Sequence, residues 1–326
     1  ELYHAESSGI AKDRLTPKLR NTAIALWKIY VSLTVLCALG YFLSGMTIFD
    51  AVSHSFSTVA IGGFSTHDAS IGYFNSISIE MIAIFFMFLA GINFSLHFLA
   101  WNNKSFIDYI KDSEFKTYVM VLVGSSVIVI IALTLNAEYG SSIETIRYSL
   151  FQTISIATTT GFTSQNYSSW PAAIPFFLIM MSFIGACVGS TGGGIKVIRI
   201  LVMFRLGMKE IHKFIRPNAQ VSIKLNKASI NEKALVSVLG FFSLYAISFI
   251  FIMMLAVSTL STTPILSEEF SSKSKIPFSF SVILMPPFTR TILYKIHLIA
   301  SSFPKIIQFR KRSNILCIHY HHYLPI

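Results

Sequence analysis

Two stretches of this 326-residue chain, 98 residues apart, are closely similar. They read STVAIGGFS at residues 57–65 and SIATTTGFT at residues 155–163. Each follows a short apolar segment that carries Ser and Thr, and each lies between long hydrophobic segments. A repeated unit of helix, half-helix, glycine-centred loop and helix builds pores that are lined by backbone carbonyls. The repeat therefore indicates an ion-conducting membrane protein.

The composition favours the membrane class. Charged residues make up only 13% of the chain, against about a quarter in soluble proteins, and the mean hydropathy is +0.63. The net charge of +11 alone would fit a nucleic-acid partner. Up to residue 260, however, Lys and Arg cluster between hydrophobic segments, as they do in cytoplasmic membrane loops. We therefore expect a membrane and no nucleic acid as partner.

Hydrophobic segment lengths predict the architecture. Five segments reach the roughly 20 apolar residues that span a bilayer: residues 22–44, 76–101, 117–135, 170–208 and 233–260. Two shorter apolar stretches, at residues 49–60 and 143–157, suit re-entrant half-helices, which are tolerated where protein buries them or where they line a watery cavity. We predict an all-α integral membrane protein with repeated units of membrane helix, pore half-helix and membrane helix, as in a potassium-channel-like pore.

The same segments give domain boundaries. We expect a cytoplasmic N-terminal segment at residues 1–21, one pore unit at 22–101 and a second at 117–208. A basic cytoplasmic loop follows at 209–232, and residues 233–260 form the first helix of an incomplete further unit. Since Lys and Arg crowd the segments outside the glycine loops, the positive-inside rule places both glycine loops on the outer side.

Residues 261–326 depart from the repeat. No glycine occurs after Gly240, and the sequence KSKIP at residues 273–277 stands where a third glycine loop is due. We interpret this segment as a divergent basic tail, with a shifted reading frame as one explanation. Because the chain begins with Glu1, it reads as an internal or N-terminally truncated piece.

The glycines of the repeat indicate the chemistry. Turning successive carbonyls toward one axis, where they replace the water shell of a potassium ion, requires conformations that glycine adopts cheaply. Gly63 and Gly161 stand at equivalent places, and the backbone of Ile61, Gly62, Thr159 and Thr160 would bind the ion. The half-helix ahead of each loop points the negative end of its dipole toward the cation. The candidate filter lies within residues 60–65 and 158–163 and comprises Ala60, Ile61, Gly62, Gly63, Thr158, Thr159, Thr160 and Gly161.

Three further residues are candidates for filter support: Asp50, Phe64 and Phe162. Asp50 begins the first half-helix, where we expect it to cap the helix and complement its dipole. Phe64 and Phe162 directly follow the repeat glycines.

A second glycine-rich stretch, GACVGSTGGGIK at residues 185–196, interrupts the segment 170–208, which is too long for one straight span. We predict an intramembrane gate there, formed by Gly189, Ser190, Thr191, Gly192, Gly193 and Gly194. A packing kink with no gating role is the alternative. Phosphate-binding and dinucleotide-binding loops are excluded, because Ile195 and Val197 stand where those motifs need Lys and Gly.

Residues 56–68, 157–163 and 185–199 resemble the second filter unit, the third filter unit and the intramembrane gating loop of the TrkH/KtrB family of bacterial potassium-uptake subunits. The resemblance covers roughly residues 1–260 and is greatest to the TrkH branch. It implies four membrane–pore–membrane units around one pseudo-fourfold pore, a homodimer in the bacterial inner membrane, and a cytoplasmic nucleotide-binding regulatory subunit as partner.

Function follows from the resemblance and from the number of loops. Potassium is the expected substrate, with no cofactor. No catalytic triad, carboxylate pair or Cys/His pair is legible, so we do not expect an enzyme. Two loops out of four are present, so we expect the chain alone not to conduct. The alternative function is a non-conducting membrane protein that only inserts or associates with an intact subunit.

Overall fold

A computed structural model of the chain describes residues 19–136, 138–216, 223–226, 228–230 and 232–262. All of them belong to one compact unit, Glu1–Pro277. The predicted N-terminal segment and the divergent tail therefore lie outside the described residues, except at their inner edges. There, residues 19–21 begin the first helix and residues 261–262 end the last one.

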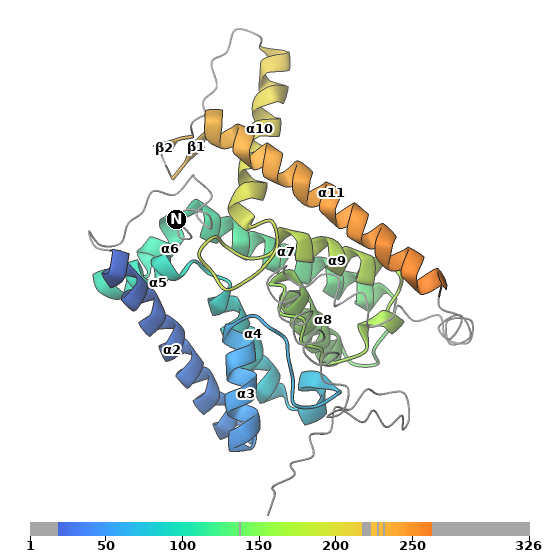
Figure 1. Ribbon diagram of the computed structural model, residues 1–326. Helices are drawn as coiled ribbons and strands as arrows, with labels where there is room; N and C mark the ends of the chain where they lie inside the picture. Colours follow the sequence, from blue (N-terminus) through green and yellow to red (C-terminus); the bar gives the residue numbers. More distant parts are fainter. Residues whose placement is uncertain (1–18, 137, 217–222, 227, 231, 263–326) are drawn as a thin grey trace, which may run out of the picture. The chain divides into compact units, whose positions relative to one another are not determined.

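The first pore unit contains α2 (Leu19–Leu43), α3 (Ile48–Val59), the 3-10 helix η1 (Ser70–Phe74), α4 (Ile77–Ala90) and α5 (Phe94–Asn103). α2 packs against α3, α4 and α5 (Figure 1). α3 is too short to span a bilayer, as predicted for residues 49–60.

The second unit repeats this order after the short helix α6 (Ile107–Lys111). It contains α7 (Ser113–Leu135), α8 (Ser142–Ala157), the 3-10 helix η2 (Tyr167–Ser169), α9 (Ala173–Ile184) and α10 (Val197–Ile215). α7 packs against α8, α9 and α10, and α8 also contacts α4 of the first unit. A buried core joins the units through Tyr41, Met87, Phe151 and Phe162.

The predicted span at residues 76–101 is wrong in one respect: it is two helices, α4 and α5, bent by 91°. The break lies against α7. A Cβ on Gly91 would lie 2.1 Å from the hydroxyl oxygen of Tyr118, so glycine lets α7 approach closely. The Asn93 side chain then accepts the Ser95 amide at 2.8 Å and starts a new helix.

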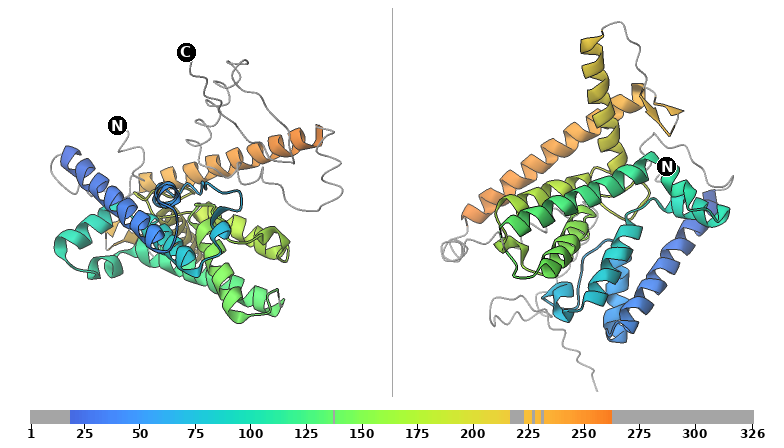
Figure 2. Two further views of the ribbon diagram at one scale, coloured as in Figure 1. Left: turned by 90° about the horizontal axis from the view of Figure 1, so that it is seen from below. Right: turned by 180° about the vertical axis from the view of Figure 1, so that it is seen from behind.

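The prediction of a loop at residues 209–232 is also wrong in part. α10 continues to Ile215, because residues 209–216 contain neither Gly nor Pro. An antiparallel pair of two-residue strands follows, β1 (Lys224–Leu225) and β2 (Ala228–Ser229). The last element, α11 (Glu232–Thr262), packs against α10 (Figure 2).

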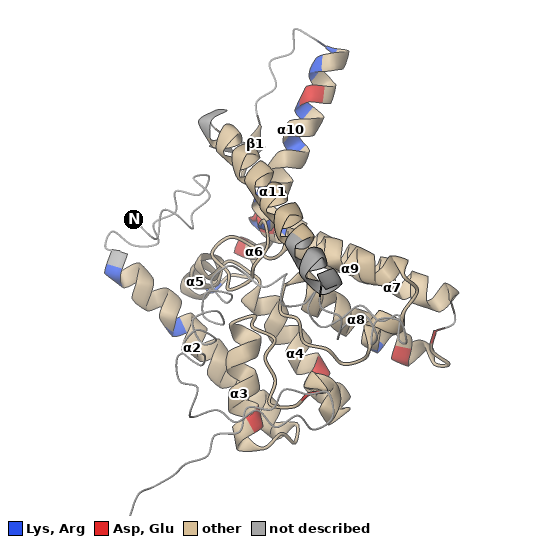
Figure 3. Cartoon of the chain, turned by 45° about the vertical axis from the view of Figure 1, so that its right-hand side comes forward, with Lys and Arg blue, Asp and Glu red and all other residues tan. Residues whose placement is uncertain are grey.

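Among the described residues, three helices are long and apolar enough to cross a membrane, at Arg20–Leu43, Ser113–Leu135 and Ala234–Ile252, and the bent pair α4–α5 makes up to four. Asp or Glu stands in the first turns of α3, α4 and α8, whereas α10 carries Lys and Arg along its length (Figure 3).

Candidate functional site

The two glycine loops leave their half-helices in the same way. α3 has its C-cap at Ala60 and α8 at Thr158, and both cap residues are still right-handed. Beyond them φ is positive at alternate residues: +53° at Ile61 and +67° at Gly63, then +69° at Thr159 and +87° at Gly161. The 98-residue spacing thus holds for backbone conformation. Backbone that alternates between right-handed and left-handed conformations turns successive carbonyls toward one side, as a carbonyl filter requires.

Ile61 and Thr159 hold strained positions. A left-handed residue that carries a Cβ costs about 1–2 kcal/mol, and a β-branched one is a clear outlier. Hydrogen bonds hold both loops at the next residue. The Gly62 amide donates to the Ser57 carbonyl at 2.7 Å, and the Thr160 amide donates to the Ser155 carbonyl at 2.8 Å. The sequence indicates left-handed backbone at the glycines, but not at Ile61 and Thr159.

The two loops pack backbone against backbone. A Cβ on Gly63 would lie 2.0 Å from the carbonyl oxygen of Thr160, so only glycine fits there. Among the described residues, no atom outside its chain neighbours lies within 4 Å of a Cβ on Gly161. Gly63 is therefore fixed by conformation and by contact with the second loop, whereas the described residues fix Gly161 by conformation alone.

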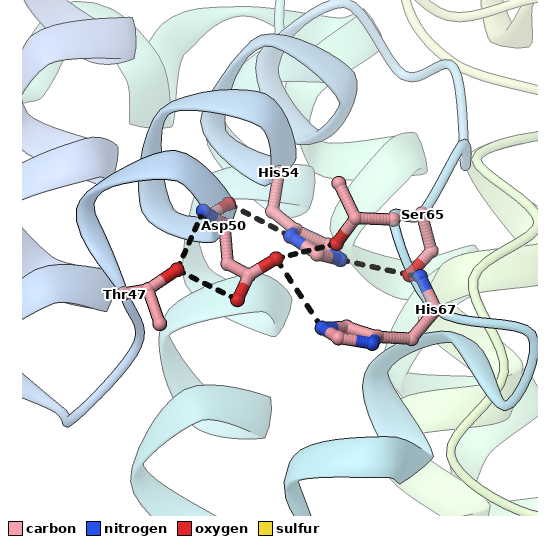
Figure 4. A network of polar contacts seen from close by, with 6 residues as sticks. Thr47, Asp50, His54, Ser65 and His67 are labelled. Atoms are coloured by element: carbon pink, nitrogen blue, oxygen red, sulfur yellow. Dashed lines mark hydrogen bonds and ion pairs between the residues drawn. The ribbon is translucent and has the colours of Figure 1, made fainter. Parts of the chain in front are cut away.

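The first loop is held from behind by Asp50, but not as predicted. The residue that caps α3 is Thr47, whose hydroxyl oxygen accepts the Asp50 amide at 3.1 Å (Figure 4). Asp50 lies in the first turn, and its carboxylate accepts the hydroxyls of Thr47 at 2.8 Å and Thr66 at 2.6 Å. The hydrogen bond from Thr66 lowers the pKa of Asp50 below its ordinary value. Asp50 thereby joins the start of α3 to the chain beyond the filter.

Two histidines complete this network. His54 Nδ1 donates to the Asp50 carbonyl at 2.8 Å, so in the neutral ring Nε2 accepts the Ser65 hydroxyl at 2.9 Å. His67 Nε2 lies 3.2 Å from Asp50 Oδ1, and its ring stacks on Tyr73 at 3.7 Å between centroids. His54 on α3 and His67 beyond the filter loop are distant in sequence, but both lie against Asp50 (Figure 4).

The second loop is held by other groups at matching places. Position 152 is the repeat equivalent of position 54, and the Gln152 amide donates to the Gln165 carbonyl at 2.7 Å. The Ser155 hydroxyl donates to the Phe162 carbonyl at 2.7 Å. Phe162 is fully buried, whereas Phe64 is 52% exposed. The predicted pair of supporting phenylalanines is therefore alike in sequence position but not in packing.

The glycine-rich segment at residues 185–196 joins α9 to α10 and lies against both filter loops. The Thr191 hydroxyl donates to the Val59 carbonyl at the end of α3, at 2.7 Å. The Gly193 amide donates to the Thr159 hydroxyl at 2.7 Å, and a Cβ on Gly192 would lie 3.2 Å from the Thr158 carbonyl oxygen. The segment predicted as a gate thus touches the ends of both half-helices.

The same segment docks onto the break between α4 and α5. That break frees backbone groups from the helical ladder. The Cys187 amide donates to the Gly91 carbonyl at 3.0 Å, the Thr191 amide to the Ala90 carbonyl at 3.3 Å, and the Phe94 amide to the Gly189 carbonyl at 3.0 Å. The segment between α9 and α10 of the second unit therefore pairs with the break between α4 and α5 of the first unit.

One ion pair joins the units on the side of the acidic helix starts. Arg147 on α8 donates to both carboxylate oxygens of Glu80 on α4, at 2.6 and 2.9 Å, and Glu80 is almost fully buried. Arg147 is the only base among the acidic residues that flank the glycine loops, so sequence contained the signal for this pair. Among the described residues no group of three His, Cys, Asp or Glu could hold a metal ion.

Half-helices that end in alternating left-handed loops, set between membrane helices, define an all-α membrane protein of the potassium-channel-like pore class. The family model of TrkH, described as cation transport protein, matches residues 1–279. The chain therefore belongs to the TrkH family. The match extends past residue 260, where the sequence resemblance was expected to end.

Relatives and a solved structure agree with this assignment. The Trk system potassium uptake protein TrkH of Halomonas elongata is 46% identical over 257 residues, which are 78% of this chain and 53% of the relative. TrkH of Escherichia coli K12 is 46% identical over 260 residues, 79% of this chain and 54% of the relative. The crystal structure of the potassium transporter TrkH from Vibrio parahaemolyticus matches with a TM-score of 0.72 and 44% identity, over 75% of this chain and 53% of that chain. The chain spans about half the length of the curated relatives it matches.

Proposed function

We propose that this chain contributes two filter loops to a potassium pathway, as part of the membrane subunit of a Trk-type uptake system in the bacterial inner membrane. The observation that carries the proposal is the repeated alternation of φ at residues 61 and 63 and at residues 159 and 161. These residues directly follow the C-terminal ends of two half-helices, where the helix dipole favours a cation.

The ligands in this proposal are backbone carbonyls of Ile61, Gly62, Thr159 and Thr160. A filter of this kind performs no covalent chemistry, so the proposed function is transport and not catalysis. The choice of potassium is supported by the names of the relatives, which are potassium uptake proteins and a potassium transporter.

The gate in this proposal is the segment 189–194. Its contacts with Val59 and Thr159 support a constriction directly next to the filter, and its five-glycine stretch from 185 to 194 gives it the freedom to move. A homodimer and a cytoplasmic nucleotide-binding regulatory subunit belong to the proposal as partners implied by the family resemblance.

Grafting tests the proposal. Residues 22–260 replace the aligned segment of the Halomonas elongata relative, and the graft is expressed in a bacterium that lacks potassium uptake. We expect growth at low potassium. A graft that is present in the membrane at the level of the intact relative, yet supports no growth, would contradict the proposed function. The graft also separates the alternative, because a non-conducting membrane protein supports no growth as a graft, whereas the chain expressed alone is expected to support none under either function.

A further inference from the structure

Glu114 is a buried acidic residue beside the intramembrane segment, with no role in the pathway described so far. It lies in the first turn of α7 and is only 6% exposed. Its own helix does not need it as a cap, because the Asp112 side chain already accepts the Phe115 amide at 2.7 Å. A carboxyl group is costly to bury unless hydrogen bonds satisfy it, so its partners explain its place.

That place is explained by a contact with the intramembrane segment. Glu114 Oε1 accepts the Val188 amide at 2.7 Å, in the first half of the segment. A side chain of α7 therefore holds the backbone of the segment at Val188.

The middle of the segment borders a cavity. In the described part of the chain, residues 188–191 line a half-open cavity of about 1080 Å³, which α2 and α5 also line. Glu114 holds the segment at Val188, and the helix break and the filter hold it at Cys187, Gly189, Thr191 and Gly193.

We propose that Glu114 is a positioning residue that clamps the intramembrane segment at Val188 and so holds its closed position against the filter. The idea that this position is the closed gate rests on the proposed function. The clamp itself does not depend on ion flux.

Release of the segment can be followed at Cys187, because this thiol lies in the segment and is buried. Cys37 is the internal control, because it lies on α2 and is buried in a different part of the core. The full chain carrying Cys317→Ser is incubated in membranes with N-ethylmaleimide, and alkylation of each thiol is followed by mass spectrometry. The variants are Glu114→Ala and Glu114→Gln, with Glu144→Ala as matched control, because Glu144 is an exposed acid in the first turn of α8.

We expect Glu114→Ala to raise the alkylation rate of Cys187 about ten- to a hundredfold, the factor for a lost hydrogen bond to a charged group. Cys37 should stay protected. Glu114→Gln keeps an acceptor oxygen and should raise the rate less. An unchanged Cys187 rate in both Glu114 variants overturns the proposal. So does a rise of Cys37 together with Cys187 in both variants, or an equal effect of Glu144→Ala. Where the alanine variant does not fold, the glutamine variant decides. Failure of the graft to support growth would remove the proposed function but would leave this result standing.

Discussion

Replacing Gly63 by alanine should damage the filter much more than replacing Gly161, although the repeat makes the two glycines equivalent. Both have a positive φ, at +67° and +87°. Only at Gly63 would the new Cβ meet the neighbouring loop, at 2.0 Å from the carbonyl oxygen of Thr160 and 2.9 Å from its carbonyl carbon. Gly161→Ala therefore carries a backbone penalty, and Gly63→Ala must also push two loops apart.

The magnitudes separate the two variants. A Cβ in the left-handed region costs about 1–2 kcal/mol, which is about a 5- to 30-fold change in an equilibrium constant. Overpacking adds about 1–3 kcal/mol, so Gly63→Ala should cost about 2–5 kcal/mol in total. Since Thr160 is a proposed ligand, the displaced carbonyl should reduce potassium selectivity as well as stability.

Both variants are made in the full chain and purified in detergent, because the contact that distinguishes them joins the two loops of this chain. The thermal unfolding temperature of each variant is compared with that of the parent. We expect Gly63→Ala to lower the free energy of unfolding by about 2–5 kcal/mol and Gly161→Ala by about 1–2 kcal/mol. Equal losses, or a larger loss for Gly161→Ala, would refute the inference that the loops pack backbone against backbone.

Three further changes test other contacts of the site. Arg147→Gln leaves the buried Glu80 carboxylate without its partner and should cost about 3–5 kcal/mol, seen as a lower unfolding temperature; a variant as stable as the parent would contradict the role of the ion pair. Thr191→Val removes the hydroxyl bond to the end of α3, worth about 1 kcal/mol, and should raise basal flux in the graft, whereas Thr191→Ser should not; equal flux in both variants would argue against this contact as a restraint. The Thr66 hydrogen bond lowers the pKa of Asp50 below its ordinary value of 3.8. The ionised Asp50 carboxylate therefore stabilises the fold above pH 3.8, and this stabilisation is lost as the pH falls through the pKa of Asp50 in the folded state. Asp50→Asn should therefore be less stable than the parent near neutral pH, and the two unfolding temperatures should converge in acid; a gap that persists in acid would refute the assignment.

Much of the fold could be predicted from sequence because its signals are local. Long apolar segments predict α2, α7 and α11, and the two short apolar stretches predict the bounds of α3 and α8 within one or two residues. The glycines of residues 185–194 gave the interruption between α9 and α10. Each of these depends on hydrophobic length or on glycine, which are readable along the chain.

The misses depend on contacts distant in sequence. The bend between α4 and α5 lies against Tyr118 of another helix, a contact that no local pattern around Gly91 reveals. His54 and His67 appear isolated until the loop brings them to Asp50. The sequence predicts Asp50 as the cap of α3 because acidic residues favour helix starts. Thr47, which comes earlier along the chain, is the N-cap residue instead.

Contacts between the two units also determine when, during synthesis, the first unit can reach its final structure. Thr163 donates to Ser70 across 93 residues, and Thr191 reaches Ala90 across 101 and Val59 across 132. Backbone groups left unpaired within a bilayer are costly, so the first loop cannot reach its final state when the ribosome has delivered only its own unit. Val59 and Ala90 must await partners that are synthesised about a hundred residues later. Insertion of the first unit is therefore provisional, and the second unit completes it.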